Sequence, residues 1–169
     1  GGPERAVCLF SLELIRALQE RELHDVVERR ARWLAIDLAA SGLIAEELVA
    51  AVRDGANTPG QSRRLRLLAD LVRAEHLKHT DAMASWEAGV QGARPLAQAA
   101  GAHALITILA DAPEEDRDGG VAQLLEWVSN AKERQLRGTA LRSLAEIRSA
   151  QNEAVAHAFA KVLASDESA

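Results

Sequence analysis

The chain of 169 residues is 48% hydrophobic and 27% charged, which allows a packed core and excludes a disordered or membrane-embedded protein. Its net charge of −5 argues against nucleic-acid binding, which usually needs a basic surface, although a local basic patch remains compatible with this charge. Because no apolar run has membrane-spanning length, no signal peptide is evident and Cys8 is the only cysteine, we expect a cytoplasmic protein.

The predicted elements are all helices, because Ala and Leu dominate the apolar residues and few segments alternate with period two. A helix in residues 1–24 precedes four helix pairs, which occupy residues 25–54, 61–91, 95–129 and 132–164. In the second pair we expect helices over 61–77 and 81–91, with Thr80 as N-cap of the latter. In the third we expect helices over 95–110 and 121–129, joined by a charged loop at 113–120. All of these elements belong to one domain, residues 1–169.

Apolar residues four apart recur in the second helix of every pair. The central residues of these stripes are 38, 38 and 35 positions apart, and they are Leu48, Trp86, Leu124 and Phe159. Each stripe follows another apolar stretch, and the four stretches are centred on Leu34, Leu68, Leu105 and Leu144. Two helices in each such period predict a stacked array: a short right-handed α-solenoid of about four antiparallel helix pairs plus an N-terminal helix. An irregular helical bundle is the alternative.

Two segments carry a family resemblance. Residues 136–147, with an Arg followed by small and Leu positions, and their partner segment 154–166 resemble the two helices of a HEAT-type repeat. Residues 65–72 and 82–89 resemble a tetratricopeptide repeat through Leu65, Leu68, Ala69, Val72, Ala82, Trp86 and Gly89. The resemblance is clearest over residues 132–166. It implies an α-solenoid, whose families mostly bind proteins, while a HEAT-like minority acts on DNA.

Charge differs between the first and second helices of the pairs. The first helices (25–41, 61–77, 95–111 and 132–148) carry a net +4, and the second helices with their flanking residues (44–54, 78–91, 113–129 and 151–167) carry −9. In a solenoid these two sets line opposite surfaces, so we expect an acidic partner on the first-helix surface. The candidate partner-binding residues are Arg63, Arg66, Arg73, Arg134 and Arg137, with Trp33 as an exposed aromatic anchor. The alternatives are an ordinary solvated surface and, for Trp33, packing on the N-terminal helix.

No pattern in the sequence predicts catalysis. His76, His79 and Asp81 lack a second pair of metal ligands, and His103 is expected at the edge of the core. Asp116, Asp118 and Gly120 begin a calcium-loop pattern, but no glutamate follows until Glu126, and a solvated loop is the alternative. We therefore expect no enzyme, no catalytic residue, no cofactor and no metal.

The leading functional hypothesis is a non-catalytic protein-interaction module or adaptor that binds a partner protein, expected to be acidic, on a helical-repeat surface. The alternative is a nucleic-acid-binding HEAT-like protein, related in chemistry to DNA-repair glycosylases, that uses the Arg-bearing first helices. A third hypothesis is a regulatory bundle that dimerises through an apolar face. The sequence leaves the choice between monomer and dimer open.

Overall fold

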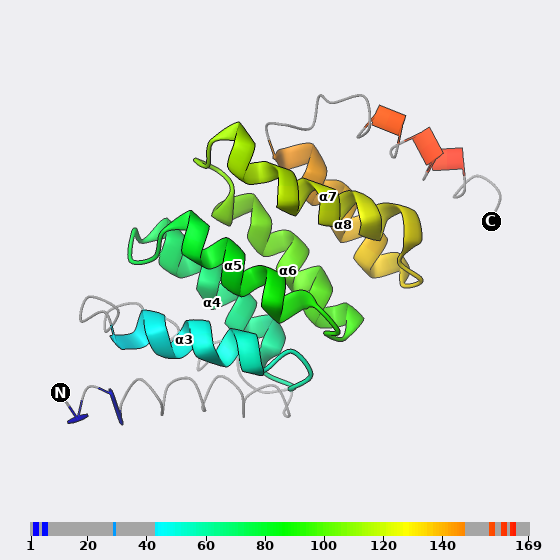
Figure 1. Ribbon diagram of the computed structural model, residues 1–169. Coiled ribbons are helices and arrows are strands. Elements are labelled where there is room, and N and C mark those ends of the chain that lie inside the picture. The colour runs from blue at the N-terminus through cyan, green and yellow to red at the C-terminus, as the bar shows by residue number, and fades with distance from the viewer. Residues whose placement is uncertain are drawn as a thin grey trace.

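The computed structural model describes residues 43–147 continuously and, outside this range, only residues 2–3, 5–6, 29, 156–157, 160–161 and 163–164 (Figure 1). All regular structure in these residues is helical, which confirms the all-α fold class. No helix in the described part combines the length and apolar character needed to cross a membrane. The helices with complete bounds are α3 (Leu43–Asp54), α4 (Gln61–Arg73), α5 (His79–Val90), α6 (Pro95–Ile108), α7 (Glu114–Asn130) and α8 (Arg134–Glu146). Three predicted helices, namely the N-terminal helix and those over 25–41 and 152–164, lie mostly outside the described residues.

The six helices lie in two layers (Figure 1). Helices α3, α5 and α7 form one layer, and α4, α6 and α8 form the other. Helix α6 packs against both α4 and α8 within its own layer, and it also contacts α5. Between the layers, α4 contacts α3 and α5, and α8 contacts α7. Helix α6 is therefore the central helix of its layer.

The predicted apolar stripes are buried in three helices. Leu48, Trp86 and Leu124, the stripe centres in α3, α5 and α7, are at most 1% exposed, which confirms the prediction for these residues. Their stripe neighbours Val52, Ala82, Val90, Gly120 and Val128 are buried as well. Phe159, the fourth predicted centre, lies outside the described residues. Leu163 of the same predicted stripe is 63% exposed, unlike its counterparts in the other helices.

Trp86 joins three helices. Its indole Nε1 donates a hydrogen bond to the Gly101 carbonyl oxygen of α6 over 2.9 Å, and its ring lies edge-on to Trp127 of α7 with the centroids 5.8 Å apart. A Cβ atom on Gly101 would lie 2.7 Å from Val90 Cγ1, closer than side-chain carbons approach. The absence of a side chain at Gly101 therefore lets α5 and α6 come close enough for the indole to reach the backbone.

Gln61 joins α3, α4 and α5 in the interior. This first residue of α4 is fully buried, and its Nε2 donates to the carbonyl oxygens of Val52 (2.8 Å) and Gly89 (2.9 Å). Both carbonyls belong to the C-terminal parts of their helices, where backbone acceptors lose their helical partners. The side chain thus satisfies acceptors from two helices with one amide group.

Helix α7 begins at Glu114, so the charged loop predicted at 113–120 is wrong. Glu114, Glu115 and Asp116 occupy its first turn, where acidic side chains interact favourably with the helix dipole. The two glycines that favoured a loop lie inside the helix. A Cβ on Gly120 would approach Leu109 Cδ1 to 2.8 Å, so this position provides close packing.

Helix α4 ends at Arg73 and α5 begins at His79, which corrects the predicted bounds 61–77 and 81–91. The N–H groups of Glu75 and His76 donate to the carbonyl oxygens of Val72 and Leu71 over 3.0 and 2.9 Å. These two bonds close α4 in a Schellman motif, with Glu75 in the left-handed conformation at φ 62°. The N-cap of α5 is Lys78 and not the predicted Thr80.

We predict that Trp86→Ala lowers the free energy of unfolding by about 3–5 kcal/mol, because it leaves a large cavity and removes the bond to Gly101. Urea unfolding monitored by circular dichroism measures this loss. The control is Glu87→Ala at the exposed neighbouring position, which should change stability by less than about 0.5 kcal/mol. Equal midpoints for the two variants would contradict the assigned role of Trp86.

We predict that Glu75→Gly raises the free energy of unfolding by about 0.5–1 kcal/mol, because glycine adopts the left-handed conformation without the clash of a Cβ atom. Ala74→Gly is the matched control. Ala74 has φ −78°, so glycine there only adds freedom to the unfolded chain and should destabilise. Thermal unfolding measures the stability of both variants. A lower melting temperature for Glu75→Gly than for the wild-type chain would contradict backbone strain at Glu75.

Candidate interaction groove

A groove runs over α6. Its first hollow has a volume of about 350 Å³ and is lined by residues of α4, α6 and α8. The α6 residues form the floor, because this helix lies between the other two; they are Leu96, Ala99, Ala100, His103 and Ile106. Helix α4 contributes Arg66 to one wall, and α8 forms the other wall with Gln135, Thr139, Arg142 and Glu146.

A second hollow of about 260 Å³ continues the groove toward the C-terminal end of α6. It shares Arg66 and His103 with the first hollow and adds Asp70, Arg73 and Thr107 among others. Arg73 Nη2 donates to Thr107 Oγ1 over 3.0 Å, and its Nη1 lies 3.8 Å from Asp70 Oδ1. These contacts hold the Arg73 side chain across α4 and α6. We call the two hollows together the α6 groove.

The groove floor is uncharged and partly apolar. Helix α6 contains no acidic or basic residue other than His103, and its small buried residues, such as Ala102 and Ala104, let neighbouring helices pack closely. At the N-terminal end of the floor, Leu96 is 57% exposed. Leu96 and Leu163 are the exposed large hydrophobic residues of the described part. Leu96 therefore adds an exposed apolar side chain to the uncharged floor.

The structure brings Arg66 and Arg73, two of the predicted arginines, to the α6 groove. Arg63 is half-buried and Arg134 is exposed, and neither lines the two hollows. Trp33 lies outside the described residues. Of the predicted arginines, the two that line the α6 groove therefore both come from α4.

Arg137 has an internal role. Its Nη1 donates to the carbonyl oxygens of Ala131 (2.9 Å) and Lys132 (2.8 Å), in the turn between α7 and α8. The guanidinium thus satisfies acceptors that follow the end of α7 and connects the turn to α8. One nitrogen of its guanidinium is thus engaged inside the chain, whereas Arg134 on the previous turn is exposed.

Sequence reasoning missed Arg142, Leu96 and His103. For Arg142 a signal exists, because residues 135, 139, 142 and 146 follow the spacing of one helix face and all line the groove. For Leu96 no local signal distinguishes an exposed leucine from a core residue. His103, expected at the core edge, is exposed on the floor. Only the packing of α4 and α8 around α6 identifies these two positions.

The two layers differ in charge. Helices α4 and α8 contain seven arginines and two acidic residues, so the α4–α6–α8 layer carries a net +5. Helices α3, α5 and α7 contain ten acidic residues and two arginines, which gives their layer −8. The α6 groove lies in the basic layer, and this favours an acidic ligand over a basic one.

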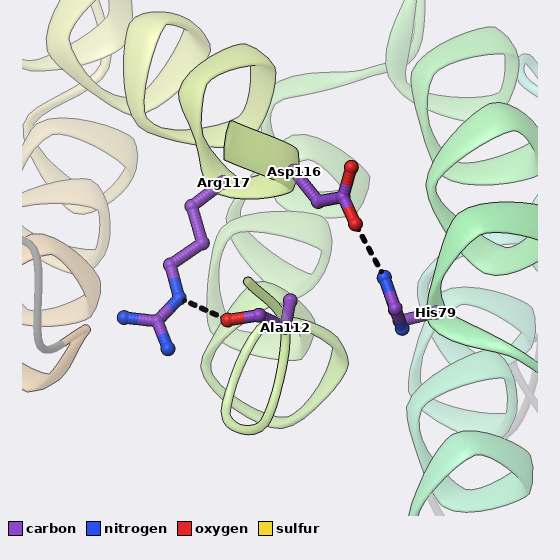
Figure 2. Close-up of polar contacts among 4 residues, drawn as sticks. All are labelled: His79, Ala112, Asp116 and Arg117. Carbon is purple, nitrogen blue, oxygen red and sulfur yellow. Dashed lines mark hydrogen bonds and ion pairs between the residues drawn. The ribbon is translucent and has the colours of Figure 1, made fainter. Parts of the chain in front are cut away.

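A polar contact between two side chains joins the first turns of α5 and α7 (Figure 2). His79 Nε2 lies 2.9 Å from Asp116 Oδ2, and beside it Arg117 Nε donates to the Ala112 carbonyl oxygen over 2.8 Å. Because the side chains of His79 and Asp116 are 30% and 39% exposed, such a pair contributes at most about 1 kcal/mol. In the described residues no group of three or more His, Cys, Asp or Glu side chains is arranged to hold a metal ion.

Comparisons of the chain with protein-family models, with curated proteins and with solved structures found no match. The geometry and charge of the α6 groove are therefore the features of this chain that point to a function.

We predict that Arg137→Ala lowers the free energy of unfolding by about 1–2 kcal/mol, because the carbonyl groups of Ala131 and Lys132 lose a charged donor. Arg134→Ala removes the same charge from an exposed position and should have an effect below about 0.5 kcal/mol. Chemical denaturation of the two variants measures the difference. Similar losses would show that the net charge of α8, and not the turn contact, accounts for the effect.

Proposed function

We propose that this chain is a non-catalytic protein-interaction module that receives a segment of a partner protein in the α6 groove. The observation that carries the proposal is the groove itself, in which an uncharged floor with the exposed Leu96 lies between Arg66 and Arg142 on opposite walls. Apolar contact along a floor with polar groups at the rim is the usual organisation of a protein-binding surface.

We further propose that the helices belong to a short right-handed α-solenoid of HEAT-like or tetratricopeptide-like type. The alternation of successive helices between two layers and the buried stripes at Leu48, Trp86 and Leu124 support this arrangement. In such an array each helix pair shares its core with its neighbours, which makes the surface rigid. A rigid groove limits the ordering cost of binding.

Nucleic acid is the second candidate, and the net +5 of the α4–α6–α8 layer favours it. The uncharged floor argues for protein, because phosphate binding places cationic groups along the path of the backbone and gains nothing from an exposed leucine. The two candidates differ in their salt dependence. A nucleic-acid complex should weaken steeply with salt, because each neutralised phosphate releases counterions.

We predict that a photo-crosslinking amino acid in place of Leu96 captures a partner protein in cells of the native host. The same amino acid in place of Glu87, on the other layer, should not capture it. Adding Arg142→Glu to the position 96 variant should reduce the yield at least about tenfold, since one favourable charge contact becomes repulsive. Arg53→Glu, an equal charge change at an exposed residue of α3, is the control and should leave the yield unchanged.

Crosslinking that persists in the Arg142→Glu variant would contradict binding in the α6 groove. Crosslinks to nucleic acid, or tight retention on duplex DNA with a steep salt dependence, would favour the second candidate over the first.

A further inference from the structure

We infer that the α6 groove binds an amphipathic α-helix of the partner, with apolar side chains on one face and carboxylates on both flanks. This inference rests on the proposed function and specifies the class of ligand.

The floor has the form of a helix-binding surface. The α6 residues that line the groove, at positions 96, 99–100, 103 and 106–107, recur every three to four residues, so they form a ridge to which a second helix can pack. Along this ridge Leu96 and His103 are exposed, positions 106 and 107 are half-buried, and the alanines at 99 and 100 are buried. Ala99 and Ala100 are small, whereas Leu96 and Ile106 are large, so the ridge leaves room for an apolar side chain of the ligand between two apolar contacts. Helix α6 has 14 residues, and its axial length is about 21 Å, which matches four turns of a ligand helix.

The walls supply cations on both sides of the floor. Arg66 from α4 and Arg142 from α8 are both exposed and line the same hollow. A guanidinium group binds a carboxylate through two parallel hydrogen bonds, so each wall can receive an acidic side chain from one flank of the ligand helix. Thr139 Oγ1, at 3.5 Å from Arg142 Nη2, is too distant to occupy that guanidinium fully.

Two acidic residues in the groove define where the ligand should not be acidic. The Asp70 side chain is only 12% exposed and lies beside Arg73, so it offsets that arginine and leaves the second hollow with a net +1 from Arg66. Glu146 is exposed at the C-terminal end of α8 and lines the first hollow with Arg142. The carboxylates of the ligand therefore belong opposite Arg66 and Arg142, and a neutral or basic residue belongs opposite Glu146.

The test uses two synthetic peptides on the order of 15 residues, matched to the length of the floor. Both carry Leu at every third or fourth position. One has Glu on both flanks, and the other has Lys at the same places. Fluorescence anisotropy measures their binding to the wild-type chain and to three variants: Arg66→Glu/Arg142→Glu, Leu96→Asp and the control Arg53→Glu. Circular dichroism confirms that each variant is folded.

We expect the wild-type chain to bind the Glu peptide at least about tenfold more tightly than the Lys peptide, as two favourable rim contacts imply. The Arg66→Glu/Arg142→Glu variant should invert this preference, Leu96→Asp should weaken the Glu peptide at least about tenfold, and Arg53→Glu should leave it unchanged. On binding, the far-ultraviolet signal of the Glu peptide should become more helical.

Equal affinity for both peptides, an unchanged preference in the Arg66→Glu/Arg142→Glu variant, or binding without helix formation would overturn the inference. The inference would also be overturned if a second copy of the chain occupied the groove. Analytical ultracentrifugation would then show a dimer that the Leu96→Asp variant does not form. If crosslinking at position 96 still captures a partner protein but the Glu peptide does not bind, the proposed function stands and this ligand class is wrong. If both experiments fail, the groove is not the binding surface.

Discussion

The close approach of α5 to α6 at Gly101 is the constraint on which the rest of the structure depends. It allows the Trp86 indole to donate to a backbone carbonyl in the middle of α6 and to contact Trp127 of α7. One buried side chain thus sets the positions of three helices in two layers. A larger residue at Gly101 would push Val90 away and separate the layers at their centre.

The small residues of α6, which include Gly101, also produce the groove. Alanine and glycine occupy most of its buried positions, so α4 and α8 can pack on both sides of the helix and leave one stripe open. A helix that is uncharged along its length is normally enclosed on all sides. In α6 the open stripe retains Leu96 and Ile106, and the arginines that border it come from the neighbouring helices.

The charges around the groove determine which ligands it favours. The arginines of α4 and α8 lie in one layer, and ten of the twelve acidic residues of the six described helices lie in the other. Several of these charges also serve the fold: Arg137 binds the turn after α7, the acidic first turn of α7 stabilises its N-terminus, and His79 pairs with Asp116. What remains for a ligand is a smaller set, in which Arg66 and Arg142 are the best placed.

The sequence by itself determined the helical class and the residues that face the core of α3, α5 and α7, because four-residue apolar spacing reports which side of a helix is buried. It also indicated a basic and an acidic set of helices. Helix ends were less predictable: the charged, glycine-containing segment 113–120 favoured a loop but forms the first turns of α7, and Glu75 adopts the left-handed conformation that non-glycine residues disfavour. Only the tertiary structure decided that Leu96 is exposed, that Arg142 borders the groove and that Arg137 is used internally. These outcomes depend on which helices pack beside α6, and such contacts between distant segments leave no mark in local sequence spacing.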